Sequence, residues 1–443
     1  MKTKIIVLTA LLLSIATFSQ KKWTLKECVE QALEKNITIQ QNKLSLEFAK
    51  KDAEIAKGEF LPNLNASSSG SFNSGLSPNE NGILNNTTNF NSSFNLSSSG
   101  ILFNGYRNLN TYKQAKLGIA SSLLDLKVIE NDVSLQIVNA YLNILFAKEN
   151  VNAAKVQFEI SKIQIKAAES RFNAGVIPKG DLLNTQSTNA NDLQNLITRE
   201  NSLDLALLTL AQLIQEPVEN FDVAPVEVSS PSATLLYSNS VDIYTIALSK
   251  MPEIERAKLA IENSDFNIEI AKGAFLPTLS YNIGAGSSYF NQFNNLFPGQ
   301  SNASFISQIT DRFQYGAGVS LNIPVFNRFQ TKNRVAQSII NKEISETRLE
   351  NQKLTLKQTI EQAFLDVKTA LKTYEAASIS LEAQKEAFKN AQERYNYGTI
   401  TLFDFDLVRT RLVNAEASMI SSKYDYVFKT KVLQFYSGEL VFE

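Results

Sequence analysis

The chain has 443 residues and a nearly balanced charge, with 43 basic against 44 acidic side chains. Such a balance does not predict nucleic acid or another acidic polymer as a partner. The sequence contains no histidine and a single cysteine, Cys28. The commonest general base and the usual metal ligands are therefore missing, and a disulfide within the chain is impossible. We expect no catalytic residues, no cofactor and no metal.

Residues 1–19 have the pattern of a secretory signal peptide. Lys2 and Lys4 precede an apolar run, and the small side chains Thr17 and Ser19 are spaced as at a signal-peptidase site. The apolar run is about a dozen residues long, short of the ~20 that a membrane-spanning helix needs. An N-terminal anchor helix is the alternative. We expect an exported protein that can enter a membrane only as strands.

Three short motifs occur twice in the same order, which predicts a tandem duplication. The first repeat is expected over residues 20–215 and the second over residues 241–443, with a linker at residues 216–240. The motif Ala-Lys-Gly-x-Phe-Leu-Pro-x-Leu occurs at residues 56–64 and 271–279, and the other two pairs are residues 102–106 with 325–329 and residues 171–175 with 394–398.

Each repeat is expected to begin with a helix and continue with a β-hairpin. Apolar residues at three- and four-residue spacing predict the lead-in helices at residues 24–57 and 241–272. Cys28 lies on the first apolar stripe, so we expect a buried small hydrophobe rather than a reactive thiol. The Leu-Pro that follows each helix disfavours its continuation. The hairpins are expected at about residues 62–103 and 277–326.

The hairpins alternate in the manner of strands that face two different environments. Over residues 279–286 and 315–323, aliphatic and aromatic side chains alternate with Gly, Ser and Asn, and residues 64–72 and 90–96 repeat the pattern more weakly. Each run is about ten residues, the length of a tilted strand that crosses a bilayer. A soluble hairpin would alternate in the same way, but small polar residues suit a water-filled lumen better than a soluble core.

Very long helices without proline are expected after each hairpin, at about residues 108–171 and 332–394. At 1.5 Å per residue, each would extend about 95 Å. Helices of this length are stable only when they pack along others, as in coiled coils. A second helix follows in each repeat, at residues 182–215 and 402–435. Each repeat therefore ends in a long helical hairpin.

The turn between the paired helices is the most specific local sequence. Gly175 fits a left-handed residue that ends one helix. Asp181 fits the N-cap or first turn of the next helix, where it complements the helix dipole. Gly398 and Asp404 repeat these roles in the second half. Two capped helical hairpins with no further role would explain these residues equally well.

With the duplicated Phe-Leu-Pro-x-Leu motif and the duplicated Arg-Phe/Tyr-Asn-x-Gly turn, the chain resembles the TolC family of outer-membrane efflux proteins over essentially its whole mature length. The resemblance implies a mainly α fold with a membrane β-barrel contribution. Four strands from each protomer of a homotrimer would close one shared twelve-strand barrel. The long helices would form an α-helical barrel that extends into the periplasm.

The same resemblance implies a function. The chain would be the outer-membrane channel subunit of a tripartite efflux or type I secretion system, a passive exit duct in contact with outer-membrane lipid. Its partners would be a periplasmic adaptor (membrane fusion) protein and an inner-membrane pump. In this family the two helical turns form the periplasmic tip, where the adaptor docks and a gate closes. Gly175, Gly398, Arg171 and Arg394 would mark the docking turns.

Three residues take gate positions by this resemblance. Asp181 corresponds to a first-turn aspartate that bonds to the neighbouring hairpin, and Tyr395 to a tyrosine of the closed-state network. Asp404 corresponds to an aspartate that forms a ring at the constriction. The alternative for Asp404 is an ordinary first-turn helix cap that faces solvent.

The chain departs from the family pattern at two gate positions. Ile400 stands where members carry a gate-locking arginine, and Leu407 stands where they carry a second constriction aspartate, with Asp406 one residue earlier. We therefore do not expect the salt-bridge lock. Closure is expected to rest on the Asp404 ring and on the neighbouring aromatic side chains instead.

Two other classes of protein fit less well. An enzyme lacks support because no nucleophile or phosphate-binding motif is present and the carboxylates accompany lysines on solvated helix faces. A soluble periplasmic coiled-coil scaffold or adaptor would have the same long helices. It gives no reason, however, for hairpins that alternate over bilayer length. Within the favoured class, the sequence does not distinguish the export of drugs, metal ions or proteins.

Overall fold

The computed structural model describes residues 22–78, 82–225, 239–294 and 302–438. The predicted signal peptide and residues 226–238 of the predicted linker lie outside these ranges. The chain divides into two compact units. The first consists of Met1–Leu44, Leu124–Glu255 and Glu350–Glu443, and the second of Ser45–Leu123 and Arg256–Leu349.

Apart from the short helix Phe305–Asp311, the helices of the described residues occur as two sets of nearly equal lengths. α4 (Arg107–Asn173) and α9 (Gln330–Asn396) have 67 residues each, and α9 begins 223 residues after α4. This is the offset at which the turn motif repeats in the sequence. The remaining long helices also form pairs: α2 (Leu25–Lys35) with α6 (Ser240–Lys250), α3 (Ile37–Gly58) with α7 (Pro252–Gly273), and α5 (Lys179–Leu213) with α10 (Leu402–Ser437).

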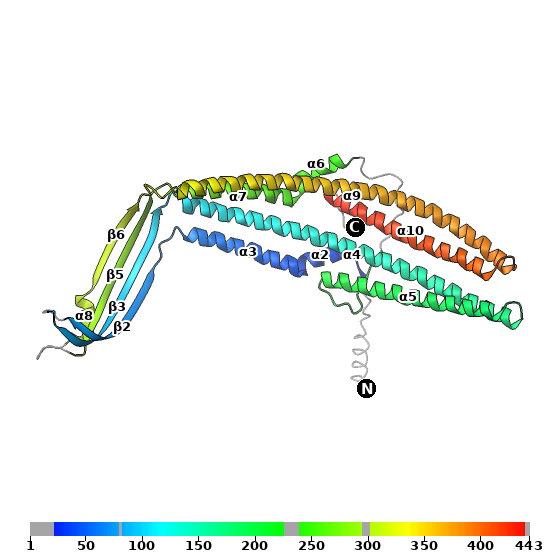
Figure 1. The fold of residues 1–443 in the computed structure, drawn as a ribbon, viewed down its shortest axis with the longest axis horizontal. Coiled ribbons are helices and arrows are strands. Elements are labelled where there is room, and N and C mark those ends of the chain that lie inside the picture. The colour runs from blue at the N-terminus through cyan, green and yellow to red at the C-terminus, as the bar shows by residue number, and fades with distance from the viewer. Residues whose placement is uncertain (1–21, 79–81, 226–238, 295–301, 439–443) are drawn as a thin grey trace, which may run out of the picture. The chain divides into compact units, whose positions relative to one another are not determined.

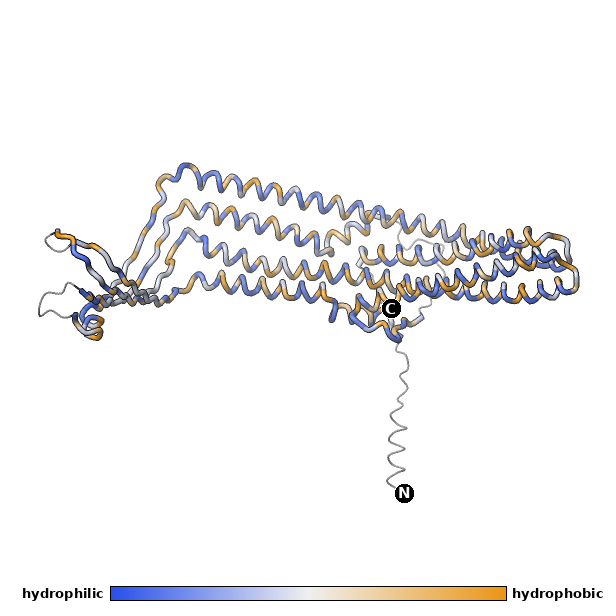
Figure 2. Tube along the Cα trace, turned by 60° about the horizontal axis from the view of Figure 1, so that its bottom comes forward, coloured by the Kyte–Doolittle hydropathy of each residue, from blue (hydrophilic) through white to orange (hydrophobic). Residues whose placement is uncertain are grey.

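Hydrophilic and hydrophobic residues alternate along the whole length of the long helices (Figure 2). Within the described part of the chain, no helix combines the length and the apolarity that crossing a membrane would require. At a rise of 1.5 Å per residue, the 67 residues of α4 correspond to about 100 Å. Such helices need packing partners along their length rather than an apolar solvent.

A two-stranded parallel sheet is fixed to the middle of α4 in the first unit. It consists of β1 (Lys22–Trp23) and β4 (Asp222–Val223). The hydroxyl of the fully buried Tyr141 donates to the Ala224 carbonyl at 2.7 Å, and Lys148 forms an ion pair with Asp222 at 2.5 Å. α2 follows β1 in the chain and has buried side chains of its own. They include Cys28, which is fully buried as predicted.

The second unit contains a four-stranded antiparallel sheet with the order β2-β3-β5-β6 (Figure 1). Its strands are β2 (Asn65–Pro78), β3 (Leu84–Phe103), β5 (Thr278–Gln292) and β6 (Gln314–Asn322). The central pairing of β3 with β5 joins the hairpin of one repeat to that of the other. A short helix, α8 (Phe305–Asp311), lies between β5 and β6 in the chain.

The register gives the sheet two different faces. On one face, Leu279 pairs with Leu321, and Ala285 pairs both with Leu96 and with Tyr315. The opposite face is built mainly from small polar residues and glycine: Ser280 with Ser320, Gly284 with Gly316 and with Ser97, and Ser69 with Ser93. Since neighbouring residues of a strand point to opposite sides, the alternation in the sequence becomes one apolar face and one small polar face.

The turns from strand to long helix use left-handed residues in both repeats. Gly105 and Tyr106 have φ of 68° and 61°, and Arg328 and Phe329 have φ of 55° and 59°. The first of these turns also makes a close approach. A Cβ on Gly105 would lie 2.2 Å from the carbonyl oxygen of Gly273, and a Cβ on Gly273 would lie 2.4 Å from that of Gly105. The backbone therefore requires glycine at both positions.

Candidate functional site

The two helical turns of the first unit have the same backbone geometry. Gly175 (φ 73°) follows α4 and Gly398 (φ 70°) follows α9. In both turns the glycine N–H donates to the carbonyl three residues earlier, at 2.9 and 3.0 Å, and the next N–H donates to the carbonyl five residues earlier, at 2.8 Å. No atom lies within 4 Å of a Cβ built on either glycine. Glycine is therefore required for its left-handed conformation and not for space.

The helices that leave the turns begin differently. The Thr401 side chain caps α10, because its oxygen accepts from the Asp404 N–H at 3.1 Å and its hydroxyl donates to the Asp404 carboxylate at 2.8 Å. α5 begins after Pro178 without a side-chain cap, and Asp181 lies in its first turn. Both carboxylates complement the positive end of a helix dipole.

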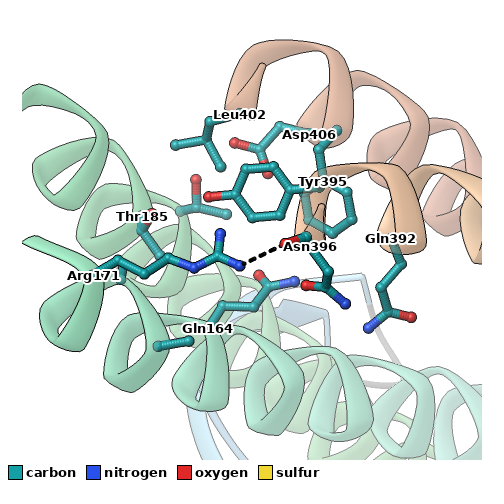
Figure 3. Close-up of a pocket in the computed structure, with 12 residues that line it drawn as sticks. Gln164, Arg171, Thr185, Gln392, Tyr395, Asn396, Leu402 and Asp406 are labelled. Atoms are coloured by element: carbon teal, nitrogen blue, oxygen red, sulfur yellow. Dashed lines mark hydrogen bonds between the residues drawn. The ribbon is translucent and has the colours of Figure 1, made fainter. Parts of the chain in front are cut away.

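A cavity of about 90 Å³ lies between the two hairpins near their turns (Figure 3). The Arg171 guanidinium at the end of α4 lies over the ring of Tyr395 on α9, with 5.2 Å between its Cζ and the ring centroid. An Arg171 Nη donates to the Asn396 carbonyl at 3.5 Å (Figure 3). Arg171 thus joins the first hairpin to the second through a cation–π contact and a hydrogen bond.

Tyr395 also fixes α9 to α10. Its ring stacks on Phe405 with centroids 5.0 Å apart and an angle of 17° between the planes, and Phe405 in turn contacts Phe388 at 5.6 Å. Burial raises the pKa of the Tyr395 phenol, and the nearby Arg171 partly opposes this. The phenol is therefore neutral, and it contributes to the contact between hairpins as a packed ring.

A buried arginine forms a second contact between the hairpins. Arg409 on α10 forms an ion pair with Asp192 on α5, and the two side chains are only 7% and 17% exposed. When its amide is oriented to satisfy both groups, the Gln157 oxygen on α4 accepts from the same guanidinium. Arg409 therefore connects three helices from both repeats. Burial raises the pKa of the neighbouring Asp406 carboxyl. The charge of Arg409 opposes this increase, and the charge of Asp192 adds to it.

The structure brings some of the predicted site residues together and leaves others apart. Arg171 and Tyr395 are in contact, and with Asp181 and Gly398 they line a larger groove of about 980 Å³ beside the small cavity. Ile400 and Asp406 line the same groove. The other predicted residues lie at the surface around it: Asp404 and Arg394 are exposed, and Gly175 lies at the tip of its turn.

The Arg409–Asp192 contact was missed by the sequence analysis. The available signal was the position of Arg409 on the helix, because Leu402, Phe405 and Leu412 define a three- and four-residue stripe on which Arg409 also falls. A charged residue on an apolar stripe is seldom buried without a partner. The partner itself, on a helix of the other repeat, has no local signature.

In the described residues, no group of histidine, cysteine or acidic side chains is arranged to hold a metal ion. The duplicated helices, the four-stranded sheet with one apolar face, and the paired turns define the class of the protein: an export channel subunit of the outer membrane. Comparison with known proteins agrees. The family model described as "Outer membrane efflux protein" matches residues 28–215 and 243–439. The chain belongs to this family.

Its relatives are distant but span most of the chain. The sequence is 22% identical over 435 residues to outer membrane protein TolC of Escherichia coli K12, covering 96% of this chain and 84% of TolC. It is 23% identical over 410 residues to cation efflux system protein CusC of the same organism, covering 90% of this chain and 81% of CusC. The fold is similar to that of the Campylobacter jejuni CmeC outer membrane channel, with a TM-score of 0.74, 21% identity, and coverage of 94% and 86% of the two chains.

These findings confirm the expected fold class, a mainly helical TolC-like chain built from a tandem repeat. They also confirm the expected function and location. The protein is an outer-membrane channel subunit of an efflux or secretion system, placed in the outer membrane with an extension into the periplasm. The alternative, a soluble coiled-coil scaffold or adaptor, is not favoured.

Proposed function

We propose that three copies of the chain form one passive exit duct. Their strands close a shared twelve-strand barrel in the outer membrane, and their long helices form the wall of a periplasmic tunnel. The two faces of the sheet support this arrangement, because the apolar face suits lipid and the small polar face suits a water-filled lumen. The order of the strands supports it too, since β2 and β6 are edge strands whose backbone groups lipid would leave unpaired.

We propose that the duct is gated where the two helical turns meet. The observation that carries this proposal is the contact of Arg171 with Tyr395, which joins the two hairpins beside the groove that Asp181 lines. It places an arginine at the hairpin contact although Ile400 occupies the expected lock position. In the trimer, three exposed Asp404 carboxylates form a ring at the constriction, and such a ring favours cations.

The remaining partners follow from the same arrangement. The turns around Gly175 and Gly398, with Arg171 and Arg394, are the surface on which a periplasmic adaptor protein docks. An inner-membrane pump selects the cargo and supplies the energy. The chain itself catalyses no reaction and holds no cofactor.

Single-channel conductance in a planar bilayer tests the duct and its gate together. Wild-type protein is compared with Asp404→Ala and with Asp425→Ala, a control that removes an exposed carboxylate elsewhere on α10. We expect a cation-preferring pore that loses this preference or opens more readily in Asp404→Ala, and no change in the control. A pore that is unaffected by Asp404→Ala would refute the gate assignment. Protein that never inserts would refute the duct.

A further inference from the structure

The β5 strand continues beyond the strand that pairs with it. The pairing of β5 with β6 ends at Gly286 and Gln314, whereas β5 continues to Gln292. On the β6 side, residues 287–292 therefore have no strand partner among the described residues. Instead the chain forms α8 at this position, at the end of the sheet remote from the long helices (Figure 1).

Two side-chain amides occupy the place of the missing strand. The Gln308 Oε1 accepts from the Phe290 N–H at 3.0 Å, and its Nε2 donates to the Phe290 carbonyl at 2.9 Å. Asn302 does the same for Gln292, at 3.0 and 2.8 Å. Phe290 and Gln292 are two residues apart, which is the spacing at which an antiparallel partner bonds to a strand. The backbone N–H and carbonyl groups of Phe290 and Gln292 are thus bonded on this edge without a strand.

These bonds hold α8 against the sheet. Gln308 is only 5% exposed and also donates to the Ala303 carbonyl at 2.9 Å, so its amide is fully engaged. The Ser287 hydroxyl donates to the Ile309 carbonyl at 2.7 Å. α8 is therefore attached to β5 at Ser287 and Phe290, and Asn302, just before α8, attaches the chain at Gln292.

α8 covers the end of the apolar face. Phe305 packs edge-on against Phe94 and Tyr289, with centroids 6.1 and 5.2 Å apart. By strand alternation, Phe94 and Tyr289 share the face that carries Leu279 and Ile283. The outer surface of α8 then presents Ile306, which is 72% exposed. Where α8 covers the apolar face of the sheet, Ile306 therefore exposes an apolar side chain in its place.

We propose that α8 is a lipid-contacting helix at the outer rim of the barrel. Ile306 meets the acyl chains next to the headgroups, and the Gln308 and Asn302 amides close a backbone edge that lipid would otherwise leave unpaired. The inference rests on the proposed function, since it requires that the apolar face of the sheet lie in the membrane. The inference adds a helix to the lipid-facing surface, whereas the alternation of apolar and small polar residues in the sequence predicts only strands there.

Tryptophan fluorescence tests this placement. Trp23 is the single tryptophan of the sequence, so Trp23→Phe provides a background without tryptophan. Three probes are placed in it: Ile306→Trp on α8, Val319→Trp on the apolar face of β6, where the native side chain is 71% exposed, and Ser320→Trp on the opposite face. Each variant is reconstituted in phosphatidylcholine vesicles whose acyl chains carry bromine either near the headgroup or near the middle of the chain.

We expect quenching at positions 306 and 319 and none at position 320, with position 306 quenched most by bromine near the headgroup. Quenching at position 319 but not at 306 would overturn the proposal for α8, because solvent or a second copy of the chain would then cover the helix. The proposed exit duct would still stand. No quenching at 319 would refute the membrane insertion of the sheet. Strongest quenching of position 306 from mid-chain would contradict the rim position.

A second variant tests the amide. In the Ile306→Trp background, Gln308→Met keeps the size of the side chain but removes its bonds to Phe290. We expect weaker quenching and an emission shifted to longer wavelength, because α8 detaches from β5. Unchanged quenching would overturn the role of Gln308.

Discussion

Replacing Arg409 by methionine would test how the two helical hairpins are held together. Methionine keeps much of the length of the side chain but removes the charge that pairs with Asp192 and the donors that face Gln157. The substitution leaves a carboxylate buried without a partner. We expect the helical unit to lose stability and the hairpins to separate more easily near their turns.

The magnitude follows from the burial of the pair. Removing one partner of a buried ion pair costs about 3–5 kcal/mol, and we expect the lower end, about 3 kcal/mol, because Asp192 keeps 17% of its side-chain surface in solvent. This corresponds to roughly a hundredfold change in an equilibrium constant. The double variant Arg409→Met with Asp192→Leu should recover most of the loss, because an apolar pair replaces a buried ion pair at little or no cost.

Urea unfolding of the detergent-solubilised protein, followed by helix content, measures the loss of stability. The open probability in a planar bilayer measures the separation of the hairpins. Lys429→Met is the matched control, since it removes a partly exposed ion pair with Asp425 on the same helix, and we expect a change below about 1 kcal/mol. If Arg409→Met were no more disruptive than this control, or if the double variant were as unstable as the single one, the buried pair would not connect the hairpins.

Three further predictions concern the turn glycine Gly398 and the side chains of Tyr395 and Asp406. Gly398→Ala should lower the free energy of unfolding by about 1–2 kcal/mol, because Gly398 has a positive φ. Gly118→Ala should raise the free energy of unfolding by about 0.5–1 kcal/mol, because Gly118 lies inside α4 with open space around it. Thermal unfolding of the two variants measures both effects. Arg171→Met should raise the pKa of Tyr395 further, which ultraviolet titration of the phenol detects, and a lower pKa would contradict the contact. The raised pKa of Asp406 means that the folded state binds the proton of this carboxyl more tightly than the unfolded state does. Asp406 therefore makes the free energy of unfolding fall as pH rises from 3.8, the ordinary pKa, through the folded pKa. Asp406→Asn should flatten that part of the plot of stability against pH.

The sequence alone predicts the features of the fold that repeat or alternate. The echo of residues 171–175 at 394–398 predicts equivalent turns, and both turns have the same bonds and the same left-handed glycine. The alternation over residues 279–286 and 315–323 predicts two unlike sheet faces, and the register aligns them across strands. The turn motif is a short contiguous sequence that recurs after 223 residues, and the alternation has a period of two, so both can be recognised along the chain itself.

Other features could not be predicted because they depend on distant partners. α8 lies in a polar segment between two strands, and the Asn and Gln side chains there give no sign whether they face water or a strand edge. The Arg409–Asp192 pair joins residues 217 positions apart, and helix periodicity does not specify how two helices are aligned along their axes. The sequence places Arg171 and Tyr395 in corresponding turns, but it does not predict that their side chains are in contact.

The reciprocal approach of Gly105 and Gly273 limits which side chains one position in each half of the duplication can accept. A side chain at either position would meet the backbone of the other, so no second substitution at a neighbouring side chain could make room for it. Arg328, at the corresponding turn of the second half, adopts the same left-handed conformation with a long side chain. After the duplication, one copy of this turn could accept new side chains singly while the other could not. Gly58, the counterpart of Gly273 in the first half, has no atom within 4 Å of a built Cβ, so each half contains one constrained glycine and one position that is free to change.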